Sequence, residues 1–281
     1  MAKKRSRNNE KNLEKELQTF FQDLLEEVLD NLDKYWNDYQ MLQGQVDLIT
    51  APINNHHQDY YHILEKYNKK EYALGKAEGE RLVELAMGKH SNKARLPKLR
   101  AKWRQNNKDY FGTIPWSEKD LLDRVFVASR RTLARVTKDI NQVITEGYTS
   151  GKGINVVANM LTKKFNGLSD WEARRIARTE IHNSHNQGVM RIYDELNVEY
   201  TQWIAAHDDR TRESHLEIDG EIIQMGGTYS NGLRYPGDTD GDISEWINCR
   251  CSNAPFVIPY GYMAPADKER FHETDLVKIG N

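Results

Sequence analysis

Apolar side chains recur at steps of three and four residues along the first part of the chain, which is the period of a helix with one apolar face. The stripe consists of Leu13, Leu17, Phe20, Phe21, Leu24, Leu25, Val28, Leu32, Trp36, Tyr39 and Leu42. No glycine or proline interrupts it before Gly44, so it predicts one helix of roughly 30 residues, or about 45 Å. A stripe this wide packs either against the next helix of the same chain or against another protein, and the general burial of amphipathic faces favours the same chain.

The helical pattern continues in two further stretches. It breaks before Pro52, because the residue that precedes a proline is driven away from helical backbone angles. It then resumes as far as Gly88. A third stripe begins with Ser117, whose side chain is the predicted N-cap, and reaches Gly147.

Two more helices are predicted after this third stripe. The first is short and covers residues 154–165. The second begins at the sequence Ser-Asp-Trp-Glu, residues 169–172, which matches a capping box. We expect it to end near Asn197.

Beyond residue 200 the pattern changes from the helical period to the alternation of strands. Residues 200–204 alternate in this way, and residues 221–224 follow Asp219-Gly220 as the return strand of a hairpin would. Residues 247–254 predict another strand. The fold class is therefore α+β, with a long, mainly helical N-terminal region followed by a small α+β C-terminal module with short antiparallel strands.

The predicted organisation has five sections. In chain order they are a basic flexible tail at 1–11, a helical N-terminal region at 12–112 with a basic segment at 89–108, a helical segment at 113–200, a small α+β core at 201–260 and a polar tail at 261–281.

Composition agrees with long, solvated helices more than with one compact core. Hydrophobic residues make up 38% of the 281 residues, charged residues 29%, and the mean hydropathy is −0.81. No apolar run approaches the length of a membrane span, and the basic start is not followed by an apolar region, so we expect neither a membrane anchor nor a signal peptide. The two cysteines, Cys249 and Cys251, are no disulfide framework, which favours synthesis in a reducing cytoplasm.

Charge is distributed unevenly, although the net charge is only −2. Residues 194–251 hold 13 Asp/Glu against four Arg, with no Lys. The basic segment has no acidic residue among its cations, which are Lys89, Lys93, Arg95, Lys98, Arg100, Lys102, Arg104 and Lys108. Such a run attracts phosphate through counterion release, so it is a candidate DNA-binding segment. An acidic protein surface and a solvated linker are the alternatives.

A candidate metal site is formed by both cysteines and one histidine. Side chains two positions apart on a strand face the same side, so Cys249 and Cys251 would present their thiols together. His215 is the natural third ligand, with His207, Asp208 or Asp219 as a fourth, and zinc suits a mixed Cys/His set. The alternative is two small buried residues beside a hydrogen-bonded histidine. A disulfide is disfavoured because this spacing is near the upper limit of separation.

The same neighbourhood admits two readings of Asp208. With His215, Cys249 and Cys251 it could form the centre of a metal-dependent hydrolase or nuclease. In the other interpretation Asp-x-Arg-Thr is turn chemistry, in which the Asp208 side chain accepts hydrogen bonds from nearby backbone N–H groups.

The order and spacing of one set of residues also resemble the motif of a known protein family. The set consists of Arg178, Thr179, Glu180, Asp208, Arg210, Thr211, Arg212, His215, Asp219, Gly220, Asn248, Cys249, Arg250 and Cys251. It resembles the phage Mu F-like and SPP1 gp7-like minor head (head morphogenesis) proteins of tailed bacteriophages, over about residues 115–255. Residues 113–200 would then be the helical part, and 201–260 the core, of a Mu F-like domain.

The resemblance implies an architectural protein and not an enzyme. Such a protein is made in the host cytoplasm, enters the procapsid with the portal, and remains inside the virion head, where it aids assembly and then DNA packaging or ejection. Its implied partners are the portal protein, the major capsid or scaffolding protein and double-stranded DNA. In this interpretation the apolar stripes of the N-terminal helices meet the portal or capsid. The competing functions are the metal-dependent hydrolase or nuclease and a free DNA-binding protein with strongly salt-dependent affinity.

Overall fold

The computed structural model describes residues 2–38, 40–87 and 116–279. The chain forms two compact units, each gathered from separate parts of the sequence. We call Arg7–Tyr67 with Leu122–Arg178 the helical unit. We call Met1–Ser6, Asn68–Leu121 and Thr179–Asn281 the mixed unit. Four long helices contribute residues to both units, so the units do not follow one another along the chain.

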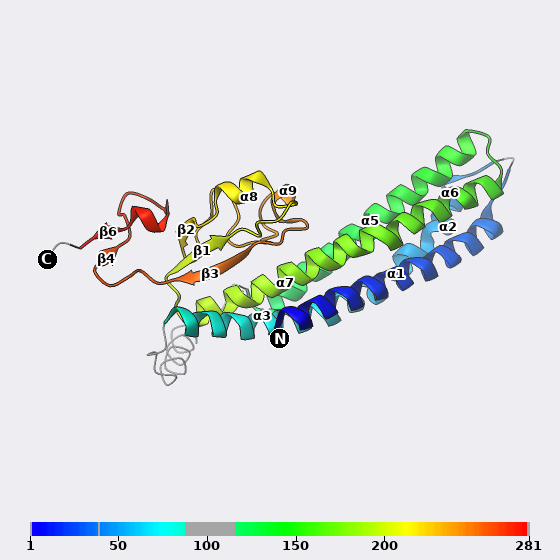
Figure 1. Ribbon diagram of the computed structural model, residues 1–281. Coiled ribbons are helices and arrows are strands. Elements are labelled where there is room, and N and C mark those ends of the chain that lie inside the picture. Colours follow the sequence, from blue (N-terminus) through cyan, green and yellow to red (C-terminus); the bar gives the residue numbers. More distant parts are fainter. Residues whose placement is uncertain (1, 39, 88–115, 280–281) are drawn as a thin grey trace. The chain divides into compact units, whose positions relative to one another are not determined.

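The helical elements confirm the predicted class of the N-terminal region. They are α1 (Ala2–Tyr35), α2 (Gln43–Asn55), α3 (His57–Ala86), α5 (Glu118–Thr149), α6 (Ile154–Gly167), the π-helical turn η1 (Leu168–Glu172) and α7 (Ala173–Glu195). In the helical unit α1, α2, α5 and α6 lie lengthwise together (Figure 1). Contacts between side chains join them, such as Trp36, directly after α1, with Tyr148 on α5, whose ring centroids are 5.9 Å apart.

The apolar stripe of α1 is buried within its own chain. Leu13, Leu17 and Phe21 are fully buried, and the ring centroid of Phe20 lies 5.2 Å from that of Tyr60 on α3. The stripe is therefore core, and the expected use of this face as a docking surface for the portal does not fit the structure.

Both ends of α1 differ from prediction. Helix α1 already begins at Ala2, where the sequence predicted a flexible tail over 1–11. Ion pairs with α7 support this polar start: Glu10 with Arg178 at 3.2 Å and Glu14 with Arg174 at 2.9 Å. The helix then ends at Tyr35, although no glycine or proline is present there.

Gln45 explains the early end of α1. Its Nε2 donates to the carbonyl of Tyr35 at 2.9 Å, and its Oε1 accepts from the N–H of Leu42 at 2.9 Å. One side chain thus satisfies a free carbonyl at the end of α1 and a free N–H at the start of α2.

Pro52 lies inside α2 and does not end the helical pattern as predicted. Proline has no N–H, so the carbonyl of Leu48, four residues earlier, loses its helical donor. Asn31 on α1 replaces that donor, since its Nδ2 lies 3.0 Å from the Leu48 oxygen. The proline is tolerated because a neighbouring helix supplies the missing hydrogen bond.

The predicted capping box at 169–172 is wrong, because the chain passes through it as the continuous π-helical turn η1 into α7. Glu172 is almost fully buried and pairs with Arg135 on α5 and with Arg175, the latter at 3.2 Å. Its carboxylate therefore serves an interhelical ion pair instead of a helix start. The predicted end near Asn197 is confirmed: α7 ends at Glu195, and Asn197 has a positive φ of 52°.

Within the mixed unit, α3 and α7 cross with their backbones in close contact. A Cβ on Gly188 would lie 2.2 Å from the carbonyl oxygen of Tyr72, and one on Gly75 would lie 2.0 Å from that of His185. Only glycine fits at both positions. Beside the crossing, Glu71 is fully buried and pairs with His185 at 2.9 Å.

The mixed unit also contains a four-stranded antiparallel sheet of order β3-β1-β2-β5. Strands β1, β2 and β3 of this sheet are labelled in Figure 1. Its strands are β1 (Tyr200–Ile204), β2 (Ile222–Gln224), β3 (Ser252–Phe256) and β5 (Arg270–Phe271). This confirms the α+β class and the predicted hairpin, in which Thr201 faces Ile223. The short helices α8 (Glu213–Glu217) and α9 (Ile243–Trp246) lie in the connections between β1 and β2 and before β3.

Two expectations for the last part of the chain need correction. The strand predicted at 247–254 begins only at Ser252, because residues 247–251 form a turn in which Asn248 has a positive φ of 54°. The polar tail at 261–281 contains β4 (Tyr262–Met263), which pairs with β6 (Val277–Lys278), and also β5. Phe271 of β5 is buried, and its strand pairs with β2, which joins this polar segment to the sheet.

Among the described residues, no helix combines the length and the apolar character needed to cross a bilayer.

Candidate functional site

Most of the motif residues lie in the mixed unit, on three segments. These are the start of the Thr179–Glu195 part of α7, the connection between β1 and β2 that contains α8, and the turn at 247–251. Arg178 belongs instead to the helical unit, where it pairs with Glu10. Glu180 is buried on α7.

The turn at 247–251 positions both cysteines. Its bend is fixed by Asn248, whose N–H donates to the Thr179 hydroxyl at 3.0 Å, and by the N–H of Cys249, which donates to the carbonyl of Trp246 at 3.3 Å. Cys249 and Cys251 are both free thiols and both buried. The prediction that their thiols face the same side is confirmed, although a turn and not a strand produces this arrangement.

His215 on α8 reaches both sulfurs from the opposite side. Its Nδ1 lies 3.7 Å from Cys249 Sγ and 3.4 Å from Cys251 Sγ, and its side chain is 1% exposed. All three ligand atoms lie within 4.8 Å of one another. The structure therefore brings together three of the four residues that the sequence assigned to a metal site.

Glu245 on α9 holds the other edge of the His215 ring. Its Oε2 lies 3.0 Å from His215 Nε2 and also accepts from the Ser214 hydroxyl at 3.0 Å. The ring edge of Trp203 packs against the imidazole with centroids 5.1 Å apart. These contacts direct Nδ1 toward the sulfurs. Glu245 was not among the residues predicted from the sequence, because its place four residues before Cys249 gives no signal beyond its residue type.

The two thiols influence one another. Cys249 hydrogen-bonds to the sulfur of Cys251, which lowers the pKa of Cys251, and the contact with His215 lowers it further. The same hydrogen bond, together with burial, raises the pKa of Cys249. A negative charge on this pair is therefore placed on the sulfur nearer to the imidazole.

Asp208, the fourth residue of the predicted metal set, lies outside this group. Its carboxylate forms a two-point ion pair with Arg250, with 2.8 Å from Nε to Oδ2, and this pair lowers the pKa of Asp208. Oδ1 also accepts from the N–H of Arg210 and the hydroxyl of Thr211, each at 3.1 Å. This is the predicted turn chemistry, with both carboxylate oxygens already engaged.

Asp219 and His207, the other candidate fourth ligands, pair with each other. Their Oδ2 and Nε2 atoms are 2.7 Å apart, while Asp219 Oδ1 accepts from the N–H of Ala205 at 2.8 Å. Gly220 follows with a positive φ of 82°, which glycine adopts without strain, and its N–H donates to the Trp203 carbonyl at 2.9 Å. This part of the motif shapes the β1–β2 connection.

Arg212 and Arg250 tie that connection to the cysteine turn at two separate points. Arg212 donates to the carbonyl of Ile247 at 2.5 Å, and Arg250 reaches Asp208 as described. Thr179 adds a third tie, from α7. Asp208, Arg212 and Arg250 thus bond to one another or to backbone.

Residues 138–254 match the family described as phage Mu protein F like protein. This part of the chain, less than half of its length, is similar to that family. Minor head protein GP7 of Bacillus phage SPP1 is 31% identical over 129 residues, which are 43% of this chain and 41% of that protein.

A second relative carries an enzyme name. The NAD(+)–arginine ADP-ribosyltransferase EFV of Enterococcus faecalis is 29% identical over 161 residues, 54% of this chain and 32% of the enzyme. The chain thus spans less than half the length of both relatives. No solved structure matches it at a significant level.

The matched residues, 138–254, include all fourteen motif residues and therefore also His215, Cys249 and Cys251. The eight predicted DNA-binding residues, Lys89 to Lys108, lie outside both this match and the described residues.

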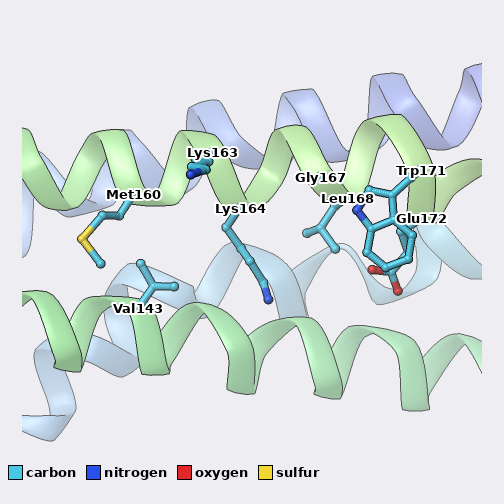
Figure 2. Close-up of a pocket in the computed structure, with 8 residues that line it drawn as sticks. All are labelled: Val143, Met160, Lys163, Lys164, Gly167, Leu168, Trp171 and Glu172. Carbon is cyan, nitrogen blue, oxygen red and sulfur yellow. The ribbon is translucent and has the colours of Figure 1, made fainter.

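A pocket of about 390 Å³ lies in the helical unit, between α5, α6 and η1 (Figure 2). Val143, Met160 and Leu168 give it an apolar floor, and Lys163 and Lys164 stand at its side. Trp171 is 56% exposed there and lies under the Arg175 guanidinium at 4.8 Å. Lys164 already pairs with Asp139 at 2.9 Å, and Glu172, which also lines the pocket, pairs with Arg175 at 3.2 Å, so these two charged side chains are engaged in ion pairs.

Proposed function

We propose that the protein is a minor head (head morphogenesis) protein of a tailed bacteriophage or prophage. The observation that carries the proposal is the match of residues 138–254 to the Mu F-like family, supported by the likeness to the minor head protein of phage SPP1. We place the protein inside the head and assign it a role in assembly, with a later role in DNA packaging or ejection.

The geometry of the motif supports action by binding. Asp208 and Arg250 neutralise each other, Arg212 donates to backbone, and Asp219 holds the β1–β2 connection. Groups used in this way stabilise loops and are not free to transfer protons to a substrate. For this reason we favour an architectural role over a hydrolase or nuclease centred on Asp208 and His215.

The proposed partners are the portal protein and the major capsid or scaffolding protein. The buried stripe of α1 is not the contact. Double-stranded DNA is the proposed partner of the basic segment at 89–108, because cations without neighbouring acids gain affinity from counterion release.

Quantitative mass spectrometry of purified phage particles and of DNA-free procapsids tests the proposal. We expect a few copies per particle in both samples, and protection from external protease until the head is opened. Tail fractions from the same lysate are the control. Absence from both kinds of particle would reject a head role.

A second experiment separates the proposed partners. Procapsids assembled without portal should lack the protein if the portal recruits it, and should retain it if the capsid or scaffold does. For DNA, replacing the eight basic residues by glutamine should weaken binding of the full chain to duplex DNA and flatten its salt dependence.

A further inference from the structure

We propose that His215, Cys249 and Cys251 bind one zinc ion, which fastens α8 to the turn at 247–251. Neither the family match nor the relatives' names assign a metal to this chain. The proposal does not depend on the head role, since it rests on the geometry of one buried cluster.

The spacing of the three ligand atoms suits a tetrahedral ion. Zinc binds sulfur at about 2.3 Å and imidazole nitrogen at about 2.05 Å, so two such ligands at the tetrahedral angle stand roughly 3.6 Å apart. The distances from His215 Nδ1 to the two sulfurs are 3.7 and 3.4 Å, on either side of that value. An ion would therefore need only small movements of the side chains.

The surroundings of His215 resemble those of a metal-bound histidine. Such a histidine uses one ring nitrogen for the metal and donates from the other to a carboxylate, which fixes its orientation and raises its basicity. Nδ1 of His215 faces the sulfurs while Nε2 meets Glu245 at 3.0 Å. Ser214 holds the same carboxylate oxygen, so the orienting group is itself fixed.

Charge and burial favour a structural ion. Two thiolates and a neutral imidazole around Zn²⁺ form a group of zero net charge, which an apolar core can bury at low cost. The cluster lies in such a core, beside Trp203, Ile218, Tyr229 and Leu233. His215 and Cys251 are each 1% exposed and Cys249 is 2% exposed, so a substrate has no access.

The protein supplies three ligands, and a water molecule would complete the coordination. Among the described residues, no further His, Cys, Asp or Glu joins the group, because Asp208, Asp219 and His207 are engaged elsewhere. The ion would hold together two segments separated in sequence by more than 30 residues. Metal binding to such a preformed site adds directly to the stability of the fold.

The first test is the metal content of the full-length chain, expressed without a metal-affinity tag and dialysed against metal-free buffer. Elemental analysis should give about one zinc per chain. Removing zinc with a chelator under native conditions should lower the melting temperature, and Zn²⁺ but not Mg²⁺ should restore it. Cobalt(II) added to the metal-free protein should give a thiolate-to-cobalt charge-transfer band and the intense visible bands of tetrahedral coordination.

Variants locate the ion. His215→Gln, Cys249→Ser and Cys251→Ser should each lose zinc and the cobalt bands. His207→Gln is the matched control, since this histidine is 61% exposed and lies outside the group, and it should keep both. Circular dichroism establishes which variants remain folded, and the cobalt spectrum of the unaltered chain decides the question if none does.

Two results would overturn the proposal. One is a folded wild-type chain that takes up neither zinc nor cobalt, which would leave the cluster as two thiols hydrogen-bonded to a histidine. The other is zinc that persists in folded Cys249→Ser and Cys251→Ser variants, or that disappears in His207→Gln, since the ion would then lie elsewhere.

Discussion

The hydroxyl oxygen of Thr179 accepts the backbone N–H of Asn248 at 3.0 Å, and so joins helix α7 to the turn that carries both cysteines. The two residues are 69 positions apart in the sequence and belong to two different parts of the family motif. Thr179 is only 5% exposed, so water cannot easily replace its oxygen. This single hydrogen bond gives the Thr179 hydroxyl a structural role at this point of the helix.

Replacing Thr179 by valine keeps the shape of the side chain and removes the acceptor. The N–H of Asn248 then loses the Thr179 oxygen as its acceptor in a buried setting, and we expect the free energy of unfolding to fall by about 1–3 kcal/mol. Thr162→Val is the control, because Thr162 only donates to the carbonyl of Ala158 within its own helix. Urea unfolding of both variants measures the difference, and equal effects would show that the bond to Asn248 contributes nothing.

The ion pair between Asp208 and Arg250 predicts a dependence of stability on pH. Arg250 holds the pKa of the Asp208 carboxyl well below its ordinary value of 3.8 in the folded state. The carboxyl therefore adds stability above its unfolded pKa, and this contribution is lost as the pH falls through the folded pKa. We expect Asp208→Asn to lower the urea midpoint near neutral pH, and the gap to wild type to narrow at about pH 3 and below.

The neighbouring residue is the control for that pH experiment. Asp209 is 90% exposed and 3.9 Å from Arg210. Asp209→Asn should leave the midpoint nearly unchanged at either pH, because exposed ion pairs contribute little. A gap between wild type and Asp208→Asn that stays constant with pH would contradict the assigned role of the pair.

The pairing of Asn31 with the carbonyl that Pro52 leaves free can be tested by a double-mutant cycle. Asn31→Ala should cost about 0.5–1.5 kcal/mol in the presence of Pro52. In the Pro52→Ala background, residue 52 regains an N–H for the Leu48 carbonyl, so the same change at Asn31 should cost less. Additive effects would mean that the two residues act independently.

Sequence periodicity predicted the kinds of elements well but not where they break. The apolar stripes of α1 and α5 and the hairpin of β1 and β2 follow from the local spacing of apolar residues, which the sequence gives directly. The end of α1 depends on Gln45, and the helical state of Pro52 depends on Asn31, so each boundary is decided by a residue of a neighbouring helix. Local signals do not contain such distant partners.

The candidate site was predictable to a similar degree. The Cys-x-Cys spacing and the motif order indicated that His215, Cys249 and Cys251 would meet, and they do. The prediction assumed that a strand would place both thiols on one side, whereas in the structure a turn with a positive φ at Asn248 does so. Asp208 was grouped with them by residue type alone. In the structure its carboxylate instead forms an ion pair with Arg250, which lies between the two cysteines in the sequence.

The crossing of α3 and α7 yields a last prediction, because it depends on the absence of two Cβ atoms. In Gly188→Ala the new methyl group would lie 2.2 Å from the Tyr72 oxygen and 3.0 Å from the Lys76 nitrogen, both backbone atoms that cannot move without shifting a helix. We expect a loss of at least about 2 kcal/mol, as for other overpacked cores. Gly44→Ala is the matched control, since nothing lies within 4 Å of its Cβ, and it should stabilise α2 by roughly 0.5–1 kcal/mol. Hydrogen exchange of the α3 and α7 amides locates the effect: faster exchange there in Gly188→Ala but not in Gly44→Ala is expected, and unchanged exchange in both would show that the helices separate without penalty.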